Sequence, residues 1–111
     1  MAAGSEAALP PQEVRILNLQ VEPQPDGRRV KIRLELTPFQ QDPSLELIIV
    51  DEQGGEVSRV FIIETIDDHL LFTMHLRSGT PGTAYQLNAR LYYDELGTID
   101  EKNLPFQMDE S

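Results

Sequence analysis

The feature that most constrains the fold is a strict alternation of apolar and charged side chains between Arg29 and Leu36. The apolar residues stand at every second position, namely Val30, Ile32, Leu34 and Leu36, and the residues between them are charged. Successive side chains of an extended strand point to opposite faces, whereas a helix places apolar residues three or four positions apart. The segment therefore predicts a β-strand with one face in the core and one in water.

The same period of two recurs along the chain, and no segment shows a helical period. Further strands are expected at 14–21, 45–51, 57–66, 69–76, 85–93 and 104–108. The apolar phase of the first strand slips near Leu17, which predicts a bulge or a crossing between sheets. Pro105 cannot donate to a ladder and places the last strand at a sheet edge or at a bulge. Seven strands separated by turns rich in Pro, Gly, Asp and Asn predict an all-β, seven-stranded antiparallel β-sandwich of immunoglobulin-like topology.

The 111 residues fit one domain. We expect a flexible N-terminal tail at 1–12, the sandwich at 13–108 and a C-terminal tail at 109–111. The pair Asp67-Asp68 leaves two connections open. It is either a tight turn within one sheet or a crossing between two sheets.

The composition excludes several classes of partner. A net charge of −10 opposes binding to nucleic acid and to anionic lipid. No apolar run approaches the roughly 20 residues of a membrane helix, so membrane insertion is not expected. The chain has no cysteine, and its first residues lack the features of a secretory or mitochondrial leader, so we expect a cytoplasmic protein.

The segment Pro81-Gly82-Thr83-Ala84-Tyr85, followed by the strand to Tyr93, resembles the tyrosine corner of fibronectin type III and other immunoglobulin-like domains. In that superfamily the tyrosine hydroxyl bonds to nearby backbone at a crossing between the sheets. The resemblance makes Tyr85 the candidate for this structural role. The hairpin around Gly54-Gly55 resembles the connection between the third and fourth strands of the same superfamily, whose members have many functions.

The chemistry of the side chains argues against an enzyme. His69 and His75 share a strand face, but six residues of extended chain separate them by roughly 20 Å, too far for one metal ion. The acidic pairs Asp67-Asp68, Asp94-Glu95 and Asp100-Glu101 fit turns and lack the spacing of a calcium-binding loop. No serine lies in a nucleophile elbow, and no glycine loop precedes a helix. We expect no catalytic residue, no metal site and no cofactor.

The middle strands are apolar on both faces. If the inward set is Leu47, Ile49, Phe61 and Ile63, a second apolar set points away from the core. That predicted interface consists of Ile48, Val50, Val60, Ile62 and Tyr92. An exposed apolar patch of this kind marks a protein contact, and a symmetric homodimer is its commonest form. The alternatives are that the N-terminal tail or the last strand covers the patch, or that the register differs.

A second surface is basic. Arg29, Lys31 and Arg33 share the outer face of their strand, and an immunoglobulin-like topology adds His75 and Arg77. Either acidic neighbours such as Glu13 or Glu35 neutralise this stripe, or it docks an acidic partner.

These observations predict a non-catalytic protein–protein interaction module that self-associates through an apolar sheet face. The alternative is an extracellular or cell-surface adhesion-type module that binds calcium or another ligand through its acidic loops.

Overall fold

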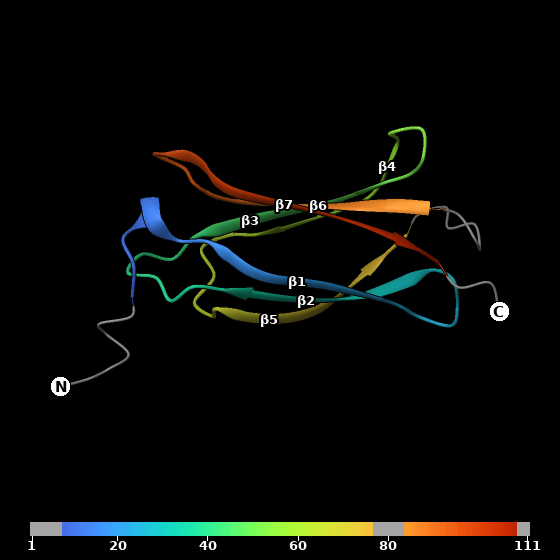
Figure 1. The fold of residues 1–111 in the computed structure, drawn as a ribbon, viewed down its shortest axis with the longest axis horizontal. Helices are drawn as coiled ribbons and strands as arrows, with labels where there is room; N and C mark the ends of the chain where they lie inside the picture. The colour runs from blue at the N-terminus through green and yellow to red at the C-terminus, as the bar shows by residue number, and fades with distance from the viewer. Residues whose placement is uncertain (1–7, 77–83, 109–111) are drawn as a thin grey trace.

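The computed structural model describes residues 8–76 and 84–108, which form two layers of antiparallel β-sheet (Figure 1). A single turn of 3₁₀-helix precedes the strands. In chain order the elements are η1 (Pro11–Glu13), β1 (Ile16–Pro23), β2 (Arg29–Leu36), β3 (Ser44–Val50), β4 (Glu56–Ile62), β5 (His69–His75), β6 (Ala84–Tyr93) and β7 (Gly97–Gln107). The prediction of an all-β sandwich with seven antiparallel strands is confirmed.

The strand order within each sheet is that of an immunoglobulin-like sandwich. One sheet has the order β1-β2-β5, and the other has the order β4-β3-β6-β7. The chain crosses between the sheets from β2 to β3, from β4 to β5 and from β5 to β6. Asp67 and Asp68 thus belong to a crossing between sheets, which decides between the two connections that the sequence left open.

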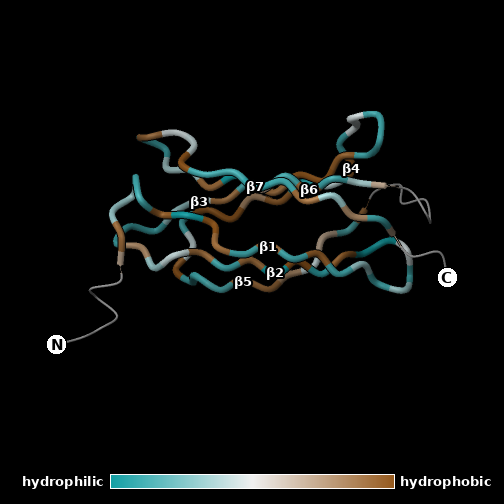
Figure 2. Tube along the Cα trace, in the orientation of Figure 1, coloured by the Kyte–Doolittle hydropathy of each residue, from teal (hydrophilic) through white to brown (hydrophobic). Residues whose placement is uncertain are grey.

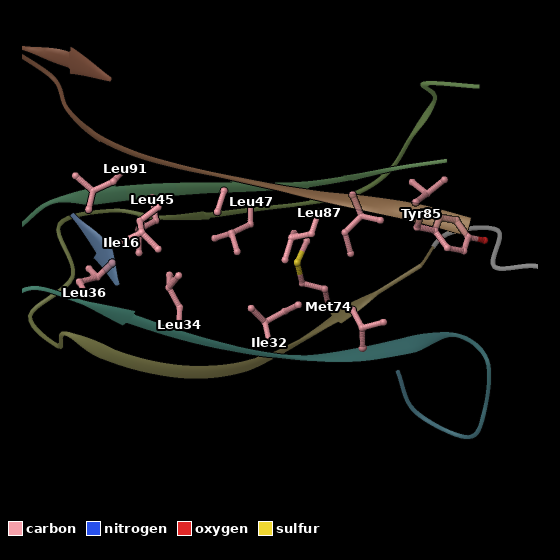
Figure 3. Close-up of a cluster of buried hydrophobic side chains, with 14 of the residues drawn as sticks. Ile16, Ile32, Leu34, Leu36, Leu45, Leu47, Met74, Tyr85, Leu87 and Leu91 are labelled. Atoms are coloured by element: carbon pink, nitrogen blue, oxygen red, sulfur yellow. The ribbon is translucent and has the colours of Figure 1, made fainter. Parts of the chain in front are cut away.

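The core lies between the two layers (Figure 3). Along β2 and β6 every second side chain is buried, as the alternation predicts, and Figure 2 shows the same alternation of hydrophobic and hydrophilic positions. Leu45, Leu47 and Leu87 of one sheet face Ile32 and Leu34 of the other. Full burial of one such side chain contributes about 1.5–3 kcal/mol to folding, so these facing rows are the main stabilisation of the sandwich.

Two irregularities lie where the sequence places them. The register between β1 and β2 shifts between Ile16 and Asn18, so the phase slip near Leu17 is a bulge, and Leu17 itself is exposed. Pro105 lies in β7, which is an edge strand because it pairs only with β6. A proline is tolerated in an edge strand because one side of that strand needs no ladder donor.

The hairpin between β3 and β4 is built around Asp51. Its carboxylate accepts hydrogen bonds from the backbone N–H groups of Gln53 at 3.0 Å and Gly55 at 2.8 Å. Gly54 has a φ of +84°, a conformation that costs glycine little because it lacks a Cβ. The hairpin predicted from Gly54-Gly55 is confirmed.

The last strand begins earlier than expected. Strand β7 begins at Gly97, so Asp100 and Glu101 lie within a strand and not in a turn. Within the expected tail at 1–12, Leu9 pairs with Phe39 in an isolated bridge and packs against the core. Residues 1–7 and 109–111 lie outside the described residues, as do Arg77 and the segment 81–83 before Tyr85, so the bounds of the two tails stay a prediction.

Candidate interaction surfaces

The register of β4 decides which of its side chains are available to a partner. Ile62 lies directly opposite Leu45, and Val60 lies opposite Leu47. Residues opposite each other in an antiparallel pair share a face, and both leucines are fully buried. Val60 and Ile62 therefore pack against the core. The expectation that they point away from it is wrong.

A bulge explains this reversal. Between β3 and β4 the register shifts, since Ile49 pairs with Ser58 and Val50 pairs with Glu56. Val57 is the additional residue, and both Val57 and Ser58 are buried. Strict alternation from Val57 then fails, because a bulge moves every later side chain to the opposite face.

Phe61 and Ile63 are exposed in consequence, at 51% and 63% of their surface. Phe61 lies on the face that points away from the core, which we call the outer face of the four-stranded sheet. Ile48, Val50 and Tyr92 lie on this face as predicted, each half-buried. Phe61 is the residue that sequence reasoning missed. Its signal would have been the bulge, which the apolar pattern of β4 does not reveal.

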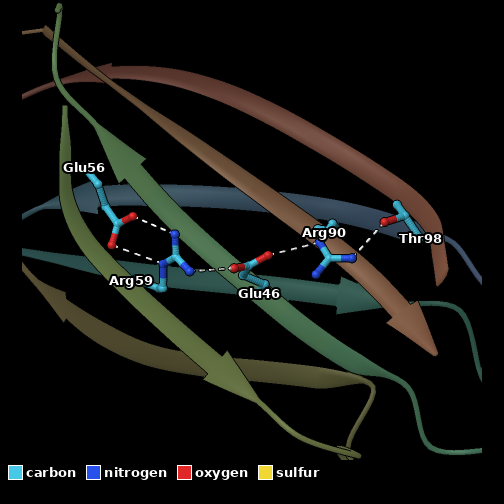
Figure 4. A network of polar contacts seen from close by, with 5 residues as sticks. All are labelled: Glu46, Glu56, Arg59, Arg90 and Thr98. Atoms are coloured by element: carbon cyan, nitrogen blue, oxygen red, sulfur yellow. Dashed lines mark hydrogen bonds and ion pairs between the residues drawn. The ribbon is translucent and has the colours of Figure 1, made fainter. Parts of the chain in front are cut away.

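An ion-pair network crosses the outer face of the four-stranded sheet (Figure 4). A Glu46 carboxylate oxygen lies 3.2 Å from Arg59 Nη1, and its second oxygen accepts a hydrogen bond from Arg90 Nε at 3.0 Å. Arg59 also donates to Glu56 at 2.7 Å, and Arg90 donates to Thr98 at 2.8 Å. The hydrogen bond to Glu56 is the main cause that raises the pKa of Arg59 above its ordinary value. The Glu46 side chain is only 12% exposed, so the network holds it between two cations.

The same arginines cover the aromatic rings of this face. The Arg90 guanidinium lies 4.3 Å from the centre of the Tyr92 ring, and that of Arg59 lies 5.7 Å from the centre of the Phe61 ring. Both distances are within the range of cation–π attraction. In the pairing of β3 with β6, Tyr92 lies opposite Ser44 and Arg90 lies opposite Glu46. The pair of Glu46 and Arg90 therefore lies between Tyr92 and Ile48. The predicted apolar patch is therefore divided by the ion pairs.

The outer face of the three-stranded sheet carries the predicted basic stripe. Arg29, Lys31 and Arg33 are exposed on β2, opposite His75, Thr73 and Leu71 of β5. Arg29 is bound to Asp26 at 2.6 Å. Within residues 8–76 and 84–108, Lys31 and Arg33 form no ion pair.

Glu35, one of the acidic neighbours expected to neutralise the stripe, is instead 3.2 Å from His69 Nε2. His69 Nδ1 lies 2.8 Å from an Asp68 carboxylate oxygen. These contacts, first the hydrogen bond with Asp68 and then the attraction of Glu35, raise the pKa of His69 above its ordinary value.

A raised folded-state pKa means that the protonated His69 favours the native state. This contribution is complete below the unfolded-state pKa of about 6.5 and is lost as the pH rises through the folded-state value. We expect the ring protons of His69 in an NMR titration to show a midpoint above that of an unstructured peptide, and Asp68→Asn to lower it. A midpoint at or below the peptide value would show that these contacts do not form in solution.

Two tyrosines of β6 fix its ends. Tyr85 is buried at the start of β6 and stacks on Phe106, with ring centres 5.7 Å apart. Its tyrosine-corner role stays a prediction, because residues 81–83 lie outside the described part of the chain. At the other end the Tyr93 hydroxyl donates a hydrogen bond to the backbone oxygen of Gln41 at 2.8 Å. Burial raises the pKa of Tyr93, which keeps this hydroxyl a donor.

An acidic hollow of about 510 Å³ lies beside Tyr93 at the end of the four-stranded sheet. Its lining includes Asp42, Glu64, Asp94 and Glu95. Within the described ranges, His, Asp and Glu form no group of three or more that could hold a metal ion. No helix in that part of the chain is long and apolar enough to cross a membrane.

Comparisons with known proteins bear on the fold alone. No family model and no curated protein matches the sequence. A glycosyl hydrolase family 2 member from Bacteroides cellulosilyticus is similar in structure, with a TM-score of 0.65 and 15% identity over 86% of this chain. A β-glucuronidase from Ruminococcus gnavus, solved with D-glucuronic acid, gives a TM-score of 0.60 and 13% identity over 86% of this chain.

The match covers only 15% and 16% of those two larger chains. This chain therefore corresponds to one β-sandwich domain within each of them. At these identities the likeness shows a shared β-sandwich fold.

Proposed function

We propose that the chain is a non-catalytic, immunoglobulin-like interaction module that self-associates through the outer face of the four-stranded sheet. The observation that carries the proposal is Phe61, a large aromatic side chain 51% exposed on that face. Glu46 of the ion-pair network lies opposite Phe61, and Ile48 and Val50 further along β3 and Tyr92 on β6 would complete the contact surface. Aromatic and arginine side chains, here Phe61, Tyr92, Arg59 and Arg90, are of the types enriched in protein interfaces.

The ion-pair network supports this choice of face. Glu46 is already bound by Arg59 and Arg90, so a partner that covers it does not leave an unpaired carboxylate. Most charged faces make poor interfaces because association buries charges that have no partner, and this costs desolvation free energy.

A fibronectin type III-like, non-catalytic role agrees with the strand order and with the small share that a similar domain occupies in the hydrolase chains. In this reading the sandwich serves as a binding or spacing domain, and the bond-breaking chemistry of those hydrolases stays outside it. The outer face of the four-stranded sheet is then the part of the module that recognises a partner, here a second copy.

Sedimentation equilibrium over a wide concentration range tests the proposal. We expect a reversible dimer for the native chain. Phe61→Asp should weaken association about a hundredfold, because a symmetric contact contains Phe61 twice and each loss of about 1.4 kcal/mol is tenfold.

Leu71→Asp is the matched control, since Leu71 is 61% exposed but lies on the opposite sheet. It should leave the dimer unchanged. A strict monomer at every concentration, or equal weakening by both substitutions, would exclude this face as a site of self-association.

A further inference from the structure

The outer face of the three-stranded sheet lies on the other sheet from the proposed interface and carries more basic than acidic side chains. Its outward side chains are Asn18, Gln20 and Glu22 on β1, Arg29, Lys31, Arg33 and Glu35 on β2, and His69, Leu71, Thr73 and His75 on β5. Three of these are basic and two are acidic, a balance of +1 with neutral histidines. The rest of a chain with net charge −10 then carries −11.

Two cations at the centre of this face have no bound counter-charge among the described residues. Lys31 and Arg33 are exposed and make no ion pair with any described residue, whereas Arg29 is held by Asp26. Lys31 lies opposite Glu22, but the two side chains do not reach ion-pair distance within the described chain. Unpaired cations two residues apart on a strand lie about 6.6–6.8 Å from each other along its direction.

An apolar side chain and two hollows accompany these cations. Leu71, 61% exposed, lies directly opposite Arg33. One hollow of about 260 Å³ is lined by Gln20, Lys31, Arg33 and Leu71 among others. A second hollow of about 210 Å³ on the other side of the Arg33–Leu71 pair includes Leu34, Leu70 and His69 in its lining.

We propose that this face binds an extended acidic peptide segment of another protein. An extended peptide repeats its side-chain direction every two residues, at the same spacing as Lys31 and Arg33. Carboxylates at alternate positions can therefore meet both cations at once, and an apolar side chain next to them can lie against Leu71. Charge-assisted pairs of this kind steer association and fix the register of the partner.

The net charge of −10 favours a short acidic peptide over a nucleic acid as the partner. Nucleic-acid binding relies on many phosphate contacts and on a broadly positive surface. The stripe offers two free cations with Glu22 and Glu35 close by, and the remainder of the chain would repel a polyanion. A short segment with few carboxylates avoids most of that repulsion.

Fluorescence anisotropy at low ionic strength tests the proposal with the full chain. The probe is a labelled peptide in which aspartate alternates with leucine. Its two controls are the same peptide with asparagine for aspartate, and a peptide of the same composition with its aspartates consecutive. We expect binding of the alternating acidic peptide that weakens as salt is added, and weaker binding of both controls.

Charge-reversal variants locate the site. The double variant Lys31→Glu, Arg33→Glu should lower the affinity at least about tenfold, since it removes both attractive contacts. Lys102→Glu is the matched control, because Lys102 is exposed on β7 of the other sheet. The milder pair Lys31→Gln, Arg33→Gln should also lower the affinity, and an unchanged melting temperature shows that the loss is not unfolding.

Four results would overturn the proposal. The first is equal affinity for the alternating and the consecutive aspartate peptides, which removes the argument from spacing. The second is an equal loss in Lys102→Glu and in the double variant. The third is a single-stranded DNA oligomer that binds this face as tightly as the peptide, which identifies a general polyanion site. Absence of any peptide binding at low salt also excludes it.

Discussion

Val60→Asp is expected to destabilise the fold by about 2–4 kcal/mol, whereas Phe61→Asp should change stability by less than about 1 kcal/mol. Val60 packs on the core side of β4 opposite Leu47, so a carboxylate there loses apolar contact and is placed against a fully buried leucine. At Phe61 the new carboxylate lies in water beside Arg59. Chemical denaturation of the two variants measures both changes.

Val60 and Phe61 are neighbours with different expected changes in stability, so comparing the two variants tests the register of β4. Ile62→Asp serves as a second variant on the core side and should behave as Val60→Asp does. If Phe61→Asp unfolds the protein and Val60→Asp does not, there is no bulge at Val57, and the side chains of β4 point to the opposite faces from those described.

The second large effect is expected at Asp100. Its carboxylate accepts a hydrogen bond at 2.9 Å from the backbone N–H of Ile16, which joins β7 of one sheet to β1 of the other. A second bond comes from the N–H of Glu101 at 3.0 Å. Asp100→Ala removes both acceptors and leaves the part-buried Ile16 N–H without this partner, which costs about 1.5–3 kcal/mol.

Asp100→Asn keeps an acceptor oxygen and should lose less than half of that stability. Glu101→Ala on the outward side of β7 is the control and should change stability by about 0.5 kcal/mol or less. A loss for Glu101→Ala as large as that for Asp100→Ala would mean that the bond between the sheets does not contribute.

Much of the fold could be predicted because single strands encode their own burial. In β2 and β6 one face is apolar and the other polar, so alternation alone assigns every buried side chain correctly. The edge position of Pro105 and the bulge near Leu17 also follow from local chemistry, since each breaks a rule that a regular paired strand obeys.

The orientation of β4 could not be predicted in the same way. Val60, Phe61, Ile62 and Ile63 are all apolar, so either face satisfies the hydrophobic effect. Which face becomes buried depends on the bulge at Val57. No particular residue type marks this bulge in the sequence. For this reason Ile48, Val50 and Tyr92 were placed correctly on the outer face, and Val60 and Ile62 were not.

Polar contacts between distant segments were equally hidden. Glu46 meets Arg59 and Arg90 only because β3 pairs with both β4 and β6. Asp100 next to Glu101 has the sequence of an acidic turn, yet the chain continues as a strand and directs this side chain to β1. Such contacts depend on strand register, which the local sequence does not specify.

Methyl NMR spectra at low and high protein concentration would test the central claim most directly. We expect the chemical shifts of Ile48 and Val50 to move with concentration, while those of Leu71 and Leu17 stay fixed. All four methyl-bearing side chains are exposed or half-buried, so each reports on its own surface. Shifts that move at Leu71 and not at Ile48 or Val50 would place the association on the opposite sheet and contradict the account.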